Sequence, residues 1–120
     1  MKFQIKCTGI YMITHKPTEQ YYIGKSVDIF TRWSQHYTDL KMRKHTSTKL
    51  QELFILRPVT EFKFEILSYY SLTDFKALNE GKSIKLINSL FNKYLLQEEK
   101  RYMKMYSVNL SLNKQNKSFG

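Results

Sequence analysis

Two short triplets near the N-terminus each pair a glycine with a tyrosine. Gly9-Ile10-Tyr11 is followed, after ten intervening residues, by Tyr22-Ile23-Gly24, and Arg32 comes eight residues after the second glycine. The pKa of a phenol is ordinarily about 10. It can therefore act as a base near neutral pH only if nearby positive charge favours its ionised form. A guanidinium group supplies such charge and also binds phosphate through a fixed fork of donors. One triplet alone is ordinary strand sequence, so the chemistry depends on the pair.

The residues around the triplets predict a β-hairpin that leads into a helix. Residues 8–14 and 20–24 are rich in β-branched and aromatic side chains, and a polar loop containing a proline separates them. Ser26 or Asp28 offers the N-cap of the helix that follows. One face of this helix is expected to carry the apolar residues that recur at steps of three and four: Phe30, Trp33, Tyr37 and Leu40.

The middle of the chain predicts a second helix and a third strand. Ser47 is placed to cap a helix that must end before Pro58. Residues 61–68 alternate polar and apolar, which is typical of a strand with one buried face. Phe62, Phe64 and Ile66 are expected to face inward.

The last third predicts two more helices. A short one covers about residues 73–79 and stops at Gly81, and a long one covers about residues 84–106. The buried stripe of the long helix is expected to contain Ile84, Ile87, Phe91, Tyr94 and Leu95. The order of elements predicts a small α/β (α+β) domain in which helices flank a three-stranded, mostly antiparallel sheet.

Length, charge and cysteine content limit the classes of protein. A chain of 120 residues fits one domain, expected to cover residues 1–120 without a separate DNA-recognition domain. The net charge of +10 attracts polyanions, nucleic acid first and acidic membrane surfaces second. No apolar run is long enough to span a bilayer. The single cysteine, Cys7, forms no disulfide within the chain, and a reducing, cytoplasmic location is expected.

The triplets at this spacing, together with Arg32, resemble the GIY-YIG nuclease superfamily, and in particular the catalytic domains of phage intron-type homing endonucleases. "RWSQHYTDL" (32–40) and "HTSTKLQELF" (45–54) resemble the helix and the following segment of those enzymes. Glu99, with Tyr102 and Met103 after it, resembles their late-helix glutamate motif. Asn113 is similar to their C-terminal asparagine. The resemblance covers residues 8 to 115.

The resemblance implies a GIY-YIG fold and a metal-dependent DNA endonuclease that uses Mg²⁺, with Mn²⁺ as an alternative. Tyr11 would position or deprotonate the attacking water, Tyr22 would help to orient the water or the phosphate, and Arg32 would bind the scissile phosphate. His45 would hydrogen-bond the phosphate or pass a proton. Asn113 would support the phosphate or the geometry of the metal-binding glutamate.

The spacing of residues alone does not decide which glutamate would bind the metal. Helical spacing sets both Glu98 and Glu99 beside apolar rows, so periodicity does not choose between them. The family pattern of a glutamate followed by an aromatic and an aliphatic residue chooses Glu99. Contacts to nucleic acid are expected from Lys25, Arg32, His36 and Lys49, and packing in the fold is the alternative role of His36.

The sequence also has features of two other classes of protein. A catalytically inactive nucleic-acid-binding module of the same fold would explain the charge. It would not need every expected site residue, yet all of them are present. A basic structural or ribosome-associated protein leaves the tyrosine spacing unexplained. If the chain is an endonuclease, one active site cuts one strand, and a homodimer or a separate specificity partner is a possible complement. A phage or mobile-element origin in a bacterial host cell is expected.

Overall fold

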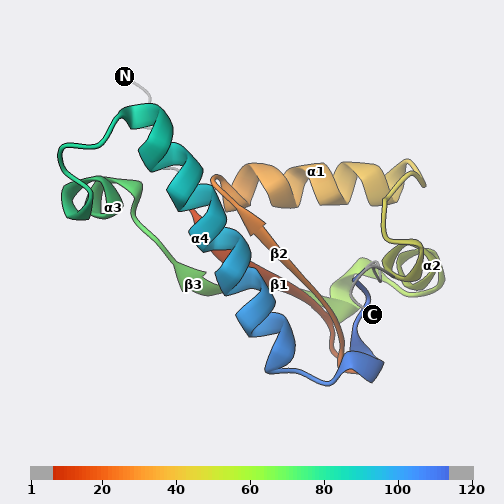
Figure 1. Ribbon diagram of the computed structural model, residues 1–120. Coiled ribbons are helices and arrows are strands. Elements are labelled where there is room, and N and C mark those ends of the chain that lie inside the picture. The colour runs from red at the N-terminus through yellow and green to blue at the C-terminus, as the bar shows by residue number, and fades with distance from the viewer. Residues whose placement is uncertain (1–6, 114–120) are drawn as a thin grey trace.

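The computed structural model describes residues 7–113 and contains a three-stranded antiparallel sheet flanked by helices (Figure 1). The strands are β1 (Gly9–His15), β2 (Gln20–Ser26) and β3 (Phe62–Tyr69). Their order is β2-β1-β3, and β1 pairs antiparallel with both neighbours. This confirms the predicted fold class and the three predicted strands.

Four helices surround the sheet, and each begins at a polar cap. They are α1 (Ile29–Lys41), α2 (Thr48–Leu56), α3 (Leu72–Leu78) and α4 (Ile84–Lys104). Single 3₁₀ turns, η1 (Val59–Glu61) and η2 (Val108–Leu110), lead into β3 and follow α4. Asp28 caps α1 and Ser47 caps α2 by accepting hydrogen bonds from backbone N–H groups in the first turns. Within residues 7–113, no helix has the length and apolar character needed to cross a membrane.

The central strand β1 is buried on both faces because helices cover both sides of the sheet. In Figure 1, α4 crosses one face of the strands, while α1 and α2 lie on the other side. The α1 face holds Tyr11 and Ile13 of β1 with Ile29, Leu40 and Leu50. Its counterpart, the α4 face, is built from buried residues of β1 and β2 packed against α4: Ile10, Met12, Tyr21 and Ile23, with Tyr102 and Met103. Alternation along β1 therefore separates Tyr11 from its neighbours Ile10 and Met12.

The apolar face that the sequence predicts for α1 is only partly buried. Phe30 and Tyr37 are 53% and 40% exposed, whereas Ile29, His36 and Leu40 are buried. An apolar pattern passes over His36 because a histidine is polar. In the fold, hydrogen bonds satisfy both of its ring nitrogens, and it occupies the buried row.

Ile66 lies on the predicted face of β3 but is 39% exposed. It pairs with Tyr11, as Phe64 pairs with Ile13, so its side chain is on the α1 face. Because β3 is an edge strand, this face is less completely covered there. Beyond Ile66 the register shifts, so that Ile10 pairs with Ser68, and β3 contains a bulge at Leu67, which packs on the α4 face.

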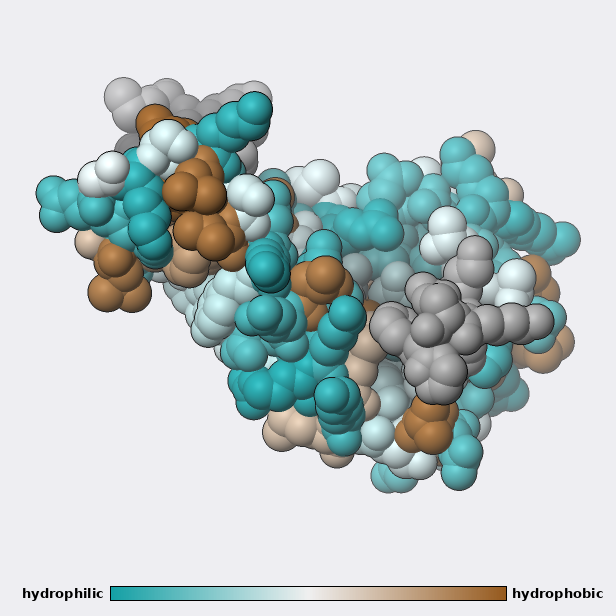
Figure 2. Space-filling model, viewed as in Figure 1, coloured by the Kyte–Doolittle hydropathy of each residue, from teal (hydrophilic) through white to brown (hydrophobic). Residues whose placement is uncertain are grey.

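The N-terminal end of α4 extends beyond the strands towards α3 (Figure 1). Ile84, on the expected buried stripe, is therefore 67% exposed, and Tyr94 is 37% exposed, while Ile87, Phe91 and Leu95 are buried as predicted. Apolar side chains gather at this end of the molecule, whereas the surface over the rest of α4 is largely hydrophilic (Figure 2).

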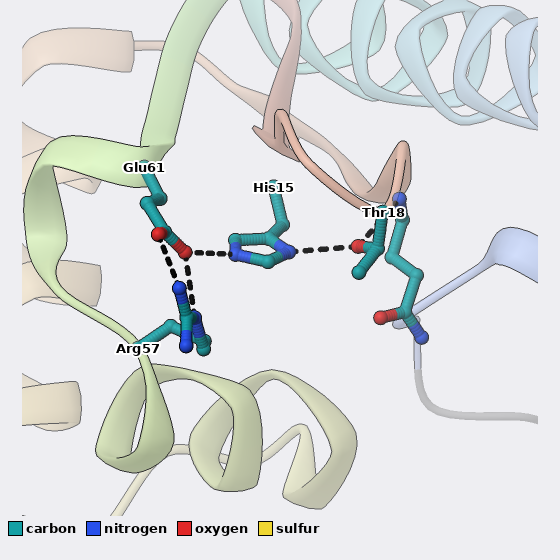
Figure 3. A network of polar contacts seen from close by, with 5 residues as sticks. His15, Thr18, Arg57 and Glu61 are labelled. Atoms are coloured by element: carbon teal, nitrogen blue, oxygen red, sulfur yellow. Dashed lines mark hydrogen bonds and ion pairs between the residues drawn. The ribbon is translucent and has the colours of Figure 1, made fainter.

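A polar network fastens the end of the β1–β2 hairpin to the start of β3 (Figure 3). His15 is buried, and its Nε2 lies 2.7 Å from Glu61 Oε1 while its Nδ1 lies 2.7 Å from Thr18 Oγ1. Arg57 donates two hydrogen bonds to the same carboxylate. Because an ionised carboxylate only accepts, His15 donates from Nε2. The network therefore holds three segments of the chain together.

Replacing Glu61 by glutamine is expected to make stability less dependent on acid. Hydrogen bonds from Arg57, and then from His15, lower the pKa of Glu61 to about 2. Since the folded-state pKa lies below that of the unfolded chain, ionised Glu61 stabilises the fold above about pH 4.3. That contribution disappears as the pH falls towards 2. Thermal unfolding of wild type and Glu61→Gln across this range measures the difference.

The gap in melting temperature should be widest above about pH 5 and should close as the pH falls. Glu52→Gln is the matched control because Glu52 is an exposed carboxylate on α2. A gap that stays constant with pH would show that the ionised carboxylate does not stabilise the hairpin.

Candidate active site

Tyr11 and Gly24 face each other across the β1–β2 ladder, and the tyrosine ring lies over the glycine. A Cβ at Gly24 would come within 2.3 Å of Tyr11 Oη, a separation that real structures do not tolerate. The last residue of the second triplet is therefore glycine because the last residue of the first triplet needs its space. The side chain of Tyr11 is 1% exposed in this position.

The glycine of the first triplet has a different neighbour. A Cβ at Gly9 would lie 1.9 Å from the backbone oxygen of Ser68, next to the bulge of β3. Glycine at this position allows β3 to approach β1 closely at the point where the register shifts. The two triplets are thus a steric requirement of the sheet around Tyr11.

The oxygen of Tyr11 lies at the end of a chain of two buried histidines. Tyr11 Oη is 2.5 Å from His36 Nε2, and His36 Nδ1 is 2.6 Å from His45 Nε2. The remaining ring nitrogen, His45 Nδ1, accepts the backbone N–H of Ser47 at 2.9 Å. Both histidine rings are buried, and they stack with centroids 4.9 Å apart.

These contacts change the roles that the sequence predicts for the two histidines. His45 was expected to bind the phosphate or pass a proton, but both of its ring nitrogens already have partners within the protein. His36 was expected either to contact nucleic acid or to pack in the fold, and it is 0% exposed and contacts Tyr11. Burial, and then the positive charge of Arg32, lower the pKa of His36 to about 3, so the ring is neutral near pH 7.

The loop that carries His45 is fixed by Gln51, a residue that sequence reasoning missed. Gln51 accepts the backbone N–H of His45 at 3.0 Å and donates to the backbone oxygen of Leu40 at 3.0 Å. Its buried amide thereby ties α2 to the end of α1. A glutamine on the buried side of a short helix was the available signal, since a buried amide needs partners on both sides.

Arg32 lies beside both phenols of the triplets. Burial raises the pKa of Tyr11 and of Tyr22, while the charge of Arg32 and its hydrogen bonding act in the opposite direction on each. Tyr22 also contacts His36 and His45 through edge-to-face ring packing, with centroids 5.1 and 5.7 Å away. One half-buried guanidinium therefore faces two hydroxyl groups that are otherwise enclosed by rings.

The structure separates the two glutamates that periodicity left equivalent. Glu98 accepts hydrogen bonds from Tyr70, at 2.8 Å, and from Arg101. Glu99 is close enough to Tyr11 and Tyr22 for its negative charge to raise the pKa of both. Burial raises the pKa of Glu99 itself, and the charge and backbone N–H of Lys25 oppose that rise.

The C-terminal part of the described chain covers the outer edge of β2. Tyr21 and Ser111 form a parallel bridge, and Leu112 donates its backbone N–H to the oxygen of Tyr21. The side-chain amide of Asn113 accepts the N–H of Ile23 at 2.9 Å and donates to its oxygen at 2.7 Å. Asn113 is therefore committed to the backbone of the second triplet.

Two lysines predicted to contact nucleic acid are exposed. Lys25 follows Gly24 at the end of β2, next to Glu99, and Lys49 lies in the first turn of α2. Tyr21 faces away from this site, as its alternation with Tyr22 predicts, and donates its hydroxyl to the backbone oxygen of Ser107.

The donor set around Glu99 suits a hard divalent cation that keeps most of its water. Mg²⁺ is commonly held by one or two carboxylates together with substrate phosphates. Within residues 7–113 no three His, Cys, Asp or Glu side chains cluster as ligands, so a Zn²⁺-type cage is not present there. The half-buried carboxylate of Glu99 fits the first pattern, and it acts on the same two phenols, Tyr11 and Tyr22, as the guanidinium of Arg32.

The overall fold matches solved nuclease domains. The catalytic domain of the homing endonuclease I-TevI aligns with a TM-score of 0.66 at 23% identity, covering 91% of this chain and 99% of that domain. A single-residue mutant of the catalytic domain of intron endonuclease I-TevI aligns with a TM-score of 0.52 at 29% identity, covering 74% of this chain and 84% of that one. The class defined by this likeness is a small nuclease-type catalytic domain.

The family follows from the sequence. A family model described as the GIY-YIG catalytic domain matches residues 7–107, so the chain belongs to the GIY-YIG family of nucleases. Intron-associated endonuclease 1 of Enterobacteria phage T4 is 38% identical over 47 residues. Those residues are 39% of this chain and 19% of that protein, so the chain matches about a fifth of its relative's length.

Gly24→Ala is expected to reduce nuclease activity about 100-fold, because the new methyl group must displace the Tyr11 ring and small displacements of a reacting group have effects of this size. Gly81→Ala is the control: Gly81 has a φ of +91° and open space around its Cβ position, so it strains the backbone without touching Tyr11. Cleavage rates and melting temperatures of both variants are to be compared. Equal losses of activity would show that the ring position does not matter.

Proposed function

We propose that this chain is a divalent-metal-dependent DNA endonuclease that hydrolyses phosphodiester bonds. The supporting observation is the juxtaposition of Glu99 with Tyr11, Tyr22 and Arg32 beside an open surface that carries Lys25. The net charge of +10 attracts the phosphate backbone of DNA. The name of the matched phage relative, an intron-associated endonuclease, supports a role in a phage or mobile element.

In this proposal each side chain has one task. Arg32 binds the scissile phosphate through its fork of donors, and Tyr22 orients the attacking water. Tyr11, as its phenolate, takes a proton from that water, whose oxygen forms a new bond to phosphorus as the bond to the leaving oxygen breaks. Glu99 would hold Mg²⁺ or Mn²⁺, which supplies charge neutralisation at the phosphate and at the leaving oxygen.

The electrostatics of the site set the pH dependence of such a reaction. Burial keeps Tyr11 protonated near pH 7, and Arg32 is the group that favours the phenolate. Substrate entry excludes water from the site, which strengthens the interaction between Arg32 and the phenolate. The cleavage rate is therefore expected to rise with pH through the neutral range.

A single site of this kind cuts one strand at a time. A double-strand break then requires either two copies of the chain or two successive cuts. Nicking of a supercoiled plasmid, followed by slower conversion to the linear form, is the pattern expected of a monomer.

The decisive comparison is between two adjacent glutamates. Glu99→Ala is expected to lower the rate of plasmid nicking in Mg²⁺ by at least about 1,000-fold, the scale of losing a principal electrostatic contribution to the transition state. Glu98→Ala is the matched control, since Glu98 accepts hydrogen bonds from Tyr70 and Arg101. Its rate should stay within about tenfold of wild type.

Two further plasmid reactions test the roles of the metal and of Tyr11. One contains wild-type protein with EDTA, and the other contains Tyr11→Phe in Mg²⁺. Loss of nicking in both is expected. Wild-type protein that shifts DNA in a gel but never nicks it, in Mg²⁺ and in Mn²⁺, would identify an inactive binding module of the same fold.

A further inference from the structure

We propose that His36 and His45 form a hydrogen-bond relay that runs in one direction only, fixed by the backbone N–H of Ser47. The relay makes the oxygen of Tyr11 a permanent hydrogen-bond acceptor on its buried side. His36 is then a positioning residue that donates to Tyr11 and never takes its proton. The catalytic meaning of this inference rests on the proposed function, but the relay itself is a property of the folded protein.

The direction follows from one donor that cannot reverse. A backbone amide only donates, so the contact of 2.9 Å from Ser47 N makes His45 Nδ1 an acceptor without a proton. The proton of a neutral His45 is therefore on Nε2. That atom lies 2.6 Å from His36 Nδ1, which must accept in turn.

The same reasoning carries through the second ring to the tyrosine. With Nδ1 accepting, the proton of His36 is on Nε2, and it is donated to Tyr11 Oη across 2.5 Å. The hydroxyl hydrogen of Tyr11 has no acceptor in this direction. It must point away from His36, and the other groups that act on this oxygen are Arg32, Tyr22 and Glu99.

The relay excludes the histidine pair as the base that activates Tyr11. To receive the tyrosine proton, His36 Nε2 would first have to lose its own hydrogen, and the shift would end with a proton on His45 Nδ1. The N–H of Ser47 occupies that position. Charged groups near the pair do not alter the geometry: Arg32 disfavours a second proton on His36, and Asp39 favours one on either ring.

A fixed donor also has a use for a buried phenol. A hydrogen bond donated to the oxygen stabilises the phenolate and leaves the neutral phenol able to donate outward. Ser47 is itself held in place, because its hydroxyl donates to the backbone oxygen of Leu112. The segment that covers the edge of β2 is thereby joined to the donor that sets the direction.

The test is the position of the ring protons in the wild-type protein, without DNA or metal. Long-range ¹H–¹⁵N spectra distinguish a nitrogen that carries a proton from one that does not, and the sequence has only three histidines. His36 and His45 should both carry the proton on Nε2, and neither ring should be doubly protonated near neutral pH. His15, in the network with Glu61, is the internal control.

A proton on Nδ1 of either His36 or His45, or a charged ring near neutral pH, would overturn the proposal. Because this measurement needs no cleavage, its result is independent of whether the chain is a nuclease.

The nicking rates of two His36 variants give a second test of the donor role. His36→Gln keeps an N–H for Tyr11 but has no titrating proton, whereas His36→Leu keeps neither. The glutamine variant is expected to nick about five- to tenfold faster than the leucine variant, the scale of one net hydrogen bond. The rise of its rate with pH should begin at lower pH. Equal rates and equal pH profiles of the two variants would contradict a donor role.

Discussion

The buried oxygen of Tyr11 is the constraint on which the arrangement of the site depends. A hydroxyl group removed from water must find partners, or the fold loses about 1–3 kcal/mol. Here the partner is a histidine, which is itself buried and needs a partner of its own, and the requirement passes through His45 to the backbone of Ser47. The hydrogen bonds that begin at one phenol therefore fix the relative positions of α1, the loop after it and the start of α2.

The same ring also sets demands on the sheet. Gly24 leaves room for it, and Gly9 lets β3 come close enough to form the bulge beside it. The central strand can place Tyr11 on one face because α4 covers the other face, on which Ile10 and Met12 pack. The helix that supports the back of the sheet also carries Glu99, so a single element supplies both the packing and the carboxylate.

Patterns of a few neighbouring residues predicted the strands, the cap of α2 at Ser47 and the spans of the four helices, and they limited the cap of α1 to Ser26 or Asp28. They failed where distant contacts decide. His36 occupies a buried row because it hydrogen-bonds a tyrosine 25 residues earlier, which no apolar period reveals. The exposure of Ile66 depends on the position of β3 at the edge of the sheet. The candidate site residues came from the family pattern, but only the three-dimensional structure separates those on the surface from those in the interior: Glu98 and Glu99 are neighbours in sequence and contact different partners.

The strand that carries the second triplet acquires its outer neighbour very late. Ile23 and Asn113 are 90 residues apart, and Ser47 and Leu112 are 65 apart, so these contacts close large loops and form only after much of the chain is in place. During synthesis the edge of β2 stays open until almost the whole described chain has been made. The hydrogen bonds that hold Ile23 and Ser47 in place are then missing from every shorter nascent chain. The backbone of the second triplet therefore receives its last hydrogen bonds only after residue 113 has been made.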